Sequence, residues 1–207
     1  MVEVAQQIEA VRRRVGSSSG GAAEDRVLTL ALELPTTPAR LWAALTTPRR
    51  LARWFLPVTG DLRAGGRFAL QGNAAGTIER CDPGAGFRAT WEFEGDVGWI
   101  DVGVGPAADG ARLTLVHRPG TADDAWARFG PAATGIGWDL SLLGLALHLV
   151  PGGAGDWAGE EDGARFVELS GEAWRAADVA AGTDPAVAAE RADRTVAAFL
   201  APPADED

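Results

Sequence analysis

Two histidines are the first side chains to consider for chemistry, and they are His117 and His148. His117 ends a predicted strand, and His148 lies near the end of a predicted long helix. Neither has a cysteine or a carboxylate at the spacing of a zinc site, so we predict no metal. The structural interpretation of His117 is a histidine at the edge of a strand. That of His148 is a histidine at the end of a helix, where its interaction with the helix dipole is favourable. The alternative is that His148, which follows a stripe of small residues, reaches a cavity.

Asp139 is the only acidic residue between positions 131 and 150. Three interpretations stay open for this carboxylate: it caps a local turn, it pairs with an arginine, or it projects into a pocket with a raised pKa. Cys81 is the single cysteine and has no histidine near it in the sequence. We therefore do not favour a nucleophilic cysteine.

Two further carboxylates lie on neighbouring predicted strands. Glu92 alternates with Trp91 and Phe93, and we expect it to point to solvent. Asp101 shares a strand face with Trp99 and is the better candidate for an acid or base inside a cavity.

The chain has eight tryptophans, which is many for 207 residues. They either fill the core or form an aromatic wall for a planar ligand, and we expect one or two to line a cavity. Ser141 belongs to the stripe of small residues, which lets a helix lie close to a sheet or leaves room beside it. The residues that we expect at a ligand cavity are Trp54, Trp91, Trp99, Asp101, His117, Trp138, Asp139, Ser141 and His148.

The composition excludes several classes of protein. The formal net charge of −10 argues against nucleic-acid binding, which needs clustered lysine and arginine. We find no apolar run of about 18 residues and predict no membrane span. One cysteine excludes an internal disulfide and fits a reducing compartment. We therefore predict a cytoplasmic protein without a cofactor.

The N-terminal half contains the helix and turn signals. Residues 2–15 place apolar side chains on one face of a predicted helix, and the Ser/Gly run at 17–21 predicts a flexible tether. Residues 27–34 are rich in Val, Leu and Thr and predict a strand. The Thr-Pro pairs at 37–38 and 47–48 then predict the starts of two short helices.

Short segments bounded by Gly, Pro or Asp-Gly follow, and they predict antiparallel hairpins. We expect these strands at residues 67–71, 76–81, 87–93, 97–104 and 112–117.

The C-terminal half is predicted to be helical. The longest apolar segment, residues 131–150, is helical by its length and by the spacing of its leucines. After a solvated loop at 159–163, we predict a helix that Ser170 caps and that Gly182 ends. Asp184 and the proline after it predict the start of a last helix.

This order of elements, together with several short motifs, resembles the SRPBCC or START-like superfamily, which has the helix-grip fold. It is most similar to the branch of the heat-shock protein 90 ATPase activator's C-terminal domain. The resemblance covers roughly residues 27–150, and the motifs that carry it are Trp54-Phe55-Leu56-Pro57, Gly60-Asp61-Leu62, Gly65-Gly66-Arg67-Phe68, Gly72-Asn73, Thr90-Trp91-Glu92-Phe93 and Gly135-Ile136-Gly137-Trp138-Asp139.

The resemblance implies an α+β helix-grip fold, in which a curved antiparallel sheet of about six strands wraps around the long helix. We divide the chain into an N-terminal helix and tether at 1–21, the START-like domain at 22–153, and a helical extension with an acidic tail at 154–207. The added terminal helices resemble those of bacterial members.

The resemblance also implies a cavity for an apolar small molecule, and we predict a binding protein for an apolar or aromatic ligand. One alternative is a cyclase- or hydrolase-like enzyme acting on a hydrophobic substrate. Another is a protein-binding adaptor or a stress-response protein resembling a co-chaperone. We expect a possible homodimer, because two amphipathic helices outside the common core would need a surface to cover them.

Overall fold

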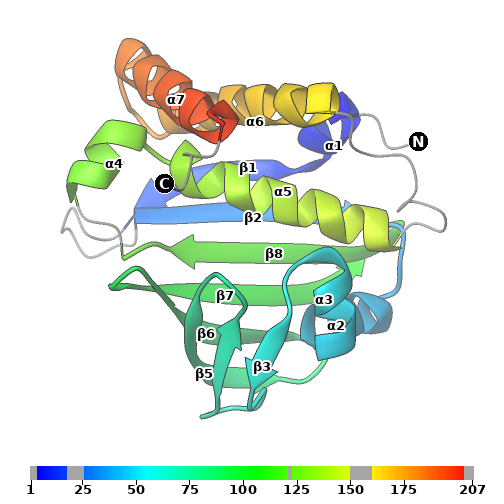
Figure 1. Ribbon diagram of the computed structural model, residues 1–207. Helices are drawn as coiled ribbons and strands as arrows, with labels where there is room; N and C mark the ends of the chain where they lie inside the picture. The colour runs from blue at the N-terminus through cyan, green and yellow to red at the C-terminus, as the bar shows by residue number, and fades with distance from the viewer. Residues whose placement is uncertain (1–3, 18–25, 121–122, 150–159, 203–207) are drawn as a thin grey trace.

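Within the residues that the structure describes, 4–17, 26–120, 123–149 and 160–202, eight strands form one antiparallel sheet. The chain is shown as a computed structural model, and its strand order is β1-β2-β8-β7-β6-β5-β4-β3 (Figure 1). The strands are β1 (Arg12–Ser17), β2 (Arg26–Leu34), β3 (Val58–Gly60), β4 (Arg67–Leu70), β5 (Ala75–Asp82), β6 (Gly86–Phe93), β7 (Asp96–Ala107) and β8 (Gly110–Arg118). The helices are α1 (Val4–Ala10), α2 (Pro38–Thr46), α3 (Pro48–Trp54), α4 (Asp123–Phe129), α5 (Ala132–Leu149), α6 (Glu160–Ala180) and α7 (Pro185–Leu200).

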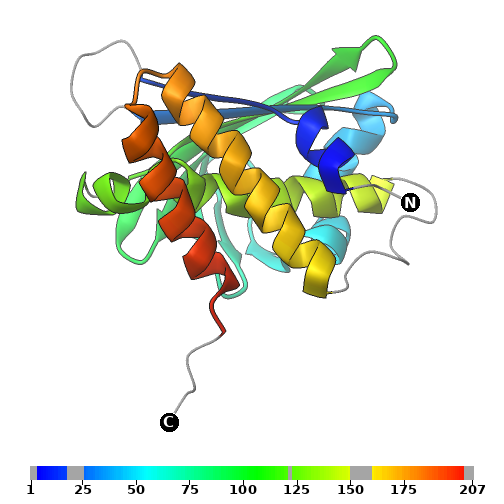
Figure 2. The ribbon, with the colours of Figure 1, turned by 90° about the horizontal axis from the view of Figure 1, so that it is seen from above.

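The two faces of the sheet differ in chemistry. Helices α5, α6 and α7 lie on one side of it (Figure 2), and alternate strand residues such as Leu30 and Leu115 are buried on that side. The opposite face carries cross-strand ion pairs, among them Glu33–Arg112 at 2.6 Å. One face therefore forms the core, and the other is solvated.

The predicted fold class is confirmed, with a long helix packed on an antiparallel sheet. The sheet has eight strands within the described residues rather than about six, because β1 and β3 were not predicted. Strand β1 begins with three arginines and has no alternation to signal it, and β3 has only three residues.

The predicted N-terminal helix is correct for Val4–Ala10 and wrong for residues 12–15, which belong to β1. These residues pair with the edge of β2, which would otherwise leave a row of backbone groups unpaired. Ile8 and Val11 are buried within the same chain, so this stripe needs no second copy to cover it. Of the predicted tether, Ser17 ends β1, and 18–21 lie outside the described residues.

Helix α5 matches its prediction closely, beginning at Ala132 and reaching Leu149. By length and composition alone it is apolar enough to cross a membrane, but half of it is buried inside the fold, as the central helix of a globular core would be.

The C-terminal prediction needs one correction. Helix α6 is a single helix, in which residues 160–163, predicted as a loop, form the first turn. Ser170 lies in its middle, fully buried, and does not cap a helix. Asp184 does cap α7 as predicted, because its side chain accepts hydrogen bonds from the backbone N–H groups of Ala186 and Val187.

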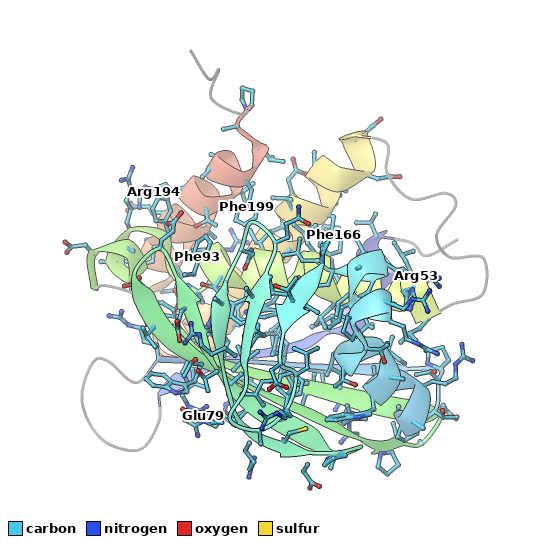
Figure 3. The ribbon with its side chains drawn as sticks, turned by 60° about the horizontal axis from the view of Figure 1, so that its bottom comes forward. Arg53, Glu79, Phe93, Phe166, Arg194 and Phe199 are labelled. Atoms are coloured by element: carbon cyan, nitrogen blue, oxygen red, sulfur yellow. The ribbon has the colours of Figure 1, made fainter. Side chains whose placement is uncertain are left out.

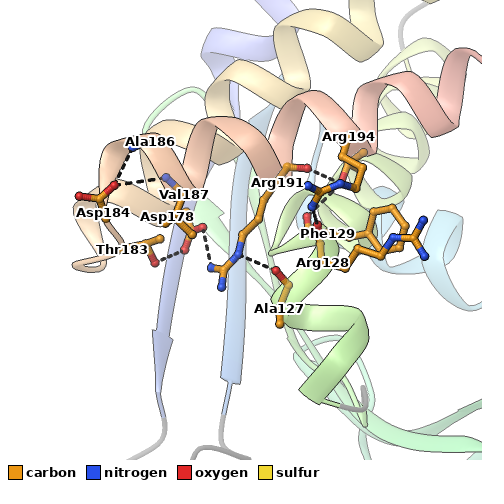
Figure 4. A network of polar contacts seen from close by, with 11 residues as sticks. Ala127, Arg128, Phe129, Asp178, Thr183, Asp184, Ala186, Val187, Arg191 and Arg194 are labelled. Carbon is orange, nitrogen blue, oxygen red and sulfur yellow. Dashed lines mark hydrogen bonds and ion pairs between the residues drawn. The ribbon is translucent and has the colours of Figure 1, made fainter.

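Helix α4 was not predicted, and side chains of α7 hold it in place (Figure 4). Arg191 Nε donates to the carbonyl of Ala127 over 3.1 Å, and Thr195 Oγ1 donates to that of Phe129 over 2.9 Å. The last carbonyls of a helix have no partner within the helix. The added helix α7 therefore satisfies the end of α4, next to the sheet end where β8 finishes.

Candidate ligand-binding site

A pocket of about 370 Å³ lies between the sheet, helices α2 and α3, and helix α5. The strands contribute apolar side chains at alternate positions, such as Ala89 on β6 and Leu115 on β8. Its wall consists mostly of aromatic and aliphatic residues: Trp42, Leu45, Thr46, Leu51, Trp54, Phe55, Val58, Leu62, Phe68, Leu70, Ile78, Cys81, Pro83, Phe87, Ala89, Trp91, Ile100, Val102, Leu113, Leu115, Trp138, Ser141 and Leu142.

Small residues on α5 explain how the helix fits beside this pocket. A Cβ atom at Gly144 would lie 2.5 Å from the backbone oxygen of Trp54, so only glycine allows the end of α3 to lie this close. A Cβ atom at Gly137 would meet nothing within 4 Å. The same stripe therefore gives a tight contact at one position and open space at another.

Aromatic rings form one wall of the pocket. Phe55 stacks on Trp54 with ring centroids 5.4 Å apart, and it lies 6.4 Å from Trp138 with nearly parallel rings. Trp138 in turn lies 5.2 Å from Trp91. These rings come from α3, the segment after it, β6 and α5, so the wall forms only when all of these elements are packed.

A second pocket of about 290 Å³ adjoins the first and shares part of its lining with it. Phe55, Trp91, Trp138 and Ser141 line both pockets. The remaining residues of the second pocket are more polar on average: Asn73, Phe93, Asp96, Gly98, His117, Pro119, Gly120, Ala133, Thr134 and Gly137. Phe93, near its rim at the end of β6, is 43% exposed (Figure 3).

His117 is the buried titratable residue of the second pocket. It is 4% exposed, and its Nδ1 accepts a hydrogen bond of 2.9 Å from Nε1 of Trp138. Burial lowers the pKa of His117 to about 4, because desolvation disfavours the imidazolium form. The imidazole is therefore neutral at pH 7.

The structure brings together five of the residues that the sequence suggested for a cavity. Trp54, Trp91, Trp138 and Ser141 line the first pocket, and His117 joins the last three at the second. The hydroxyl of Ser141 donates to the carbonyl of Gly137 over 2.8 Å, which leaves its oxygen free to accept.

Trp99 and Asp101 lie on the opposite face of the sheet, so the expectation that they face a cavity is wrong. The inward positions of β7 are occupied by Ile100 and Val102, one residue out of phase. Asp101 instead pairs with Arg118 at 2.5 Å, and Trp99 Nε1 donates to Glu79 over 3.1 Å.

Asp139 points away from both pockets, toward β1 and α6. Its carboxylate accepts from Arg13 Nε at 2.9 Å, from Trp174 Nε1 at 2.9 Å and from the hydroxyl of Ser170. Burial raises the pKa of Asp139, and these three donors oppose that shift. Of the interpretations left open by the sequence, the arginine pair is the one that the structure has.

His148 lines neither pocket. It lies near the end of α5, and desolvation followed by the charges of Arg53 and Arg50 lowers its pKa. The position of His148 on the stripe of small residues therefore does not take it to a cavity.

Several pocket residues were not singled out from the sequence, among them Phe55, Phe87 and Leu113. The alternation of apolar residues along 87–91 and 113–117 was a usable signal for the strand residues. The signal for Phe55 was weaker, because it follows the last residue of a short helix and its direction depends on the next turn.

The fold and the pocket between sheet and helix define a helix-grip protein of the START-like class. The chain belongs to the family described as Activator of Hsp90 ATPase homolog 1-like protein, whose model matches residues 35–149. No curated protein matches the chain.

Solved structures agree with this assignment. The crystal structure of CalU16 from Micromonospora echinospora is 31% identical, covers 81% of this chain and 98% of its own, and has a TM-score of 0.66. The solution structure of CalU16 is 29% identical, covers 84% of this chain and 97% of its own, with a TM-score of 0.67. Protein MLL2253 from Mesorhizobium loti, at 19% identity, 60% and 96% coverage and a TM-score of 0.53, shares the fold. CalU16 matches more of the chain than the family model does, so the likeness extends into the terminal elements.

Proposed function

We propose that the protein binds an apolar or aromatic small molecule in the first pocket, between the sheet and α5. The observation that carries this proposal is the pocket itself, about 370 Å³ in volume and lined almost wholly by aromatic and aliphatic side chains. Such a volume and lining are typical of small-molecule sites. Membership of the family supports the proposal but does not name a ligand.

The polar groups of the first pocket are uncharged. They come from Thr46, Cys81, Ser141 and the indole N–H groups of the tryptophans, and no Asp, Glu, Arg or His is among the described residues that line it. A charged ligand would lose its hydration here without a partner for its charge, at a cost of several kcal/mol. The proposed ligand body is therefore neutral.

The enzyme alternative has less support from the geometry. Asp101, Asp139 and His148, the groups considered for acid–base work, all lie outside both pockets. A loss of turnover on changing them would not report on chemistry inside the pocket.

The proposal is tested by titration with N-phenyl-1-naphthylamine, a neutral aromatic fluorophore. We expect its emission to rise on binding and the melting temperature to rise with it, since at 100 times Kd a ligand adds about 2.7 kcal/mol of stability. Trp42, Trp54, Trp91 and Trp138 line the pocket, so energy transfer from tryptophan gives a second signal. No change in either signal contradicts the proposal and favours the adaptor alternative.

A matched pair of variants locates the binding. Ala89→Phe places a ring inside the pocket, where Ala89 is 1% exposed, and we expect binding to weaken at least about tenfold. Ala69→Phe adds the same ring at an exposed position of β4 and should leave binding within about twofold of wild type. Val102→Phe fills the pocket from β7 and replaces Ala89→Phe if that variant does not fold. Equal binding by both alanine variants would place the ligand elsewhere.

A further inference from the structure

His117 has one ring nitrogen bonded within the protein and one that is not. Its Nδ1 accepts from Trp138, and the described residues offer Nε2 no hydrogen-bond partner. The Nε2 atom has no partner among these residues and yet is not fully buried, so it borders open space. That space is the second pocket, which His117 lines.

The bond from Trp138 fixes which nitrogen carries the proton. An indole N–H can only donate, so Nδ1 of His117 must have its lone pair free to accept. In a neutral imidazole the hydrogen then lies on Nε2. The depressed pKa of His117 agrees with the neutral form at pH 7. The second pocket therefore contains a pre-oriented N–H donor, since the imidazole makes T-shaped contacts with the rings of Trp138 and Trp91, whose centroids lie 5.6 Å and 6.3 Å away.

The other residues of the second pocket limit what the donor can bind. Phe55, Trp91 and Trp138 offer aromatic rings that also bound the first pocket. Asp96 is the one residue with a formal charge among the described residues that line the second pocket, and a carboxylate repels an anionic ligand. The acceptor is therefore a neutral oxygen rather than a carboxylate or phosphate.

We infer that the second pocket binds a neutral, oxygen-bearing part of the aromatic ligand, with Nε2–H of His117 donating to a carbonyl or hydroxyl oxygen. The inference rests on the proposed function, because the oxygen belongs to the ligand whose apolar body lies against the shared aromatic wall. It makes His117 the residue that selects oxygenated over purely hydrocarbon ligands.

A pair of probes of the same shape tests this inference. 2-Acetylnaphthalene has a ketone oxygen, and 2-isopropenylnaphthalene has a CH₂ group in its place. The wild-type protein should bind the ketone about three- to tenfold more tightly, which is the range that one net hydrogen bond gives. Equal binding of the two probes overturns the inference and leaves the proposed function in place, whereas no binding of either contradicts both.

Two variants separate the donor from the structural role of His117. In His117→Asn, the amide oxygen can take the place of Nδ1 opposite Trp138, but nothing replaces Nε2–H. In His117→Gln, the amide nitrogen can take the place of Nε2 and donate. We expect the ketone preference to fall to about one in the asparagine variant and to persist in the glutamine variant. A full preference in His117→Asn overturns the inference.

Imidazole nitrogen resonances of the wild-type protein give a readout that needs no folded variant of His117. The chain has two histidines, and His148→Asn assigns their signals and serves as the control for binding. We expect the ketone to shift the Nε2 resonance of His117 and the alkene to leave it nearly unchanged. The same shift with both probes, or with neither, overturns the inference.

Discussion

The two sides of helix α5 differ in how completely they are filled. Toward α6, Trp174 packs so tightly on Gly135 that a Cβ atom there would lie 2.2 Å from its ring. Toward the sheet, Trp138 and Ser141 border pockets of about 370 and 290 Å³. Protein interiors are normally close-packed, so open space beside a central helix is a feature that needs a reason.

One buried titratable residue on each side, Asp139 and His117, shows a similar difference. Asp139 accepts from three side chains at Oδ2, and Arg13 Nε also reaches Oδ1 at 3.2 Å, so both oxygens have a partner. His117 accepts from one, and its second nitrogen has no partner among the described residues. Both rely on a tryptophan N–H, but one group is saturated and the other is not. A saturated buried group holds the structure together, whereas a half-satisfied one beside a pocket is available to a ligand.

The largest expected effect comes from Asp139→Ala, which removes the buried carboxylate on the side of α5 that faces α6. This change leaves the guanidinium charge of Arg13 without its carboxylate while the side chain is only 6% exposed, and it should lower the free energy of unfolding by about 3–5 kcal/mol. Urea denaturation at pH 7 measures the loss. Asp101→Ala removes a carboxylate from the partly exposed pair with Arg118 and should cost about 1 kcal/mol or less. Similar losses in both variants would show that the Asp139 cluster is not a structural centre.

The next effect is the pH dependence of stability that comes from His117, on the side of α5 that faces the pockets. The pKa of His117 is lowered from 6.5 to about 4 in the folded protein, so the unfolded chain takes up this proton first as the pH falls. Stability from the neutral imidazole is present above pH 6.5 and is lost between about 6.5 and 4, amounting to about 3 kcal/mol.

We expect urea denaturation of His117→Asn to show a correspondingly smaller loss between pH 7 and pH 4 than the wild type. His148→Asn is the control, because His148 is only partly buried. A wild-type pH slope in the His117 variant would mean that this histidine is not held neutral by burial.

The smallest effect compares two glycines that lie two positions apart on α5. Gly135→Ala pushes a methyl group into the fully buried ring of Trp174 and should destabilise the fold by about 1–3 kcal/mol. Gly137→Ala places the same methyl group in open space and should stabilise the helix by up to about 1 kcal/mol. Urea denaturation of both variants gives the sign of each change in the free energy of unfolding. Changes of the same sign would contradict the contrast between the two sides of α5.

Local signals in the sequence were sufficient for most of the fold. The Thr-Pro pairs placed the starts of α2 and α3, Asp184 placed that of α7, and the apolar run placed α5. Strand β1 was missed because its residues 12–14 are arginines, and only the free edge of β2 makes them a strand. Of the residues expected at a ligand cavity, Trp54, Trp91, Trp138, Ser141 and His117 line one or both pockets, and their role in binding stays a prediction.

By itself, the sequence determined the family, the order of elements and which residue types were available for a site, because these depend on short-range patterns of caps, turns and alternation. Only the tertiary structure decided the roles of Asp139, Asp101 and His117. The phase of β7 turned Asp101 outward, the packing of β1 and α6 gave Asp139 its three donors, and Trp138 occupied one nitrogen of His117. Each outcome depends on which side of a strand or helix meets another element, and that is fixed by contacts between residues far apart in the chain.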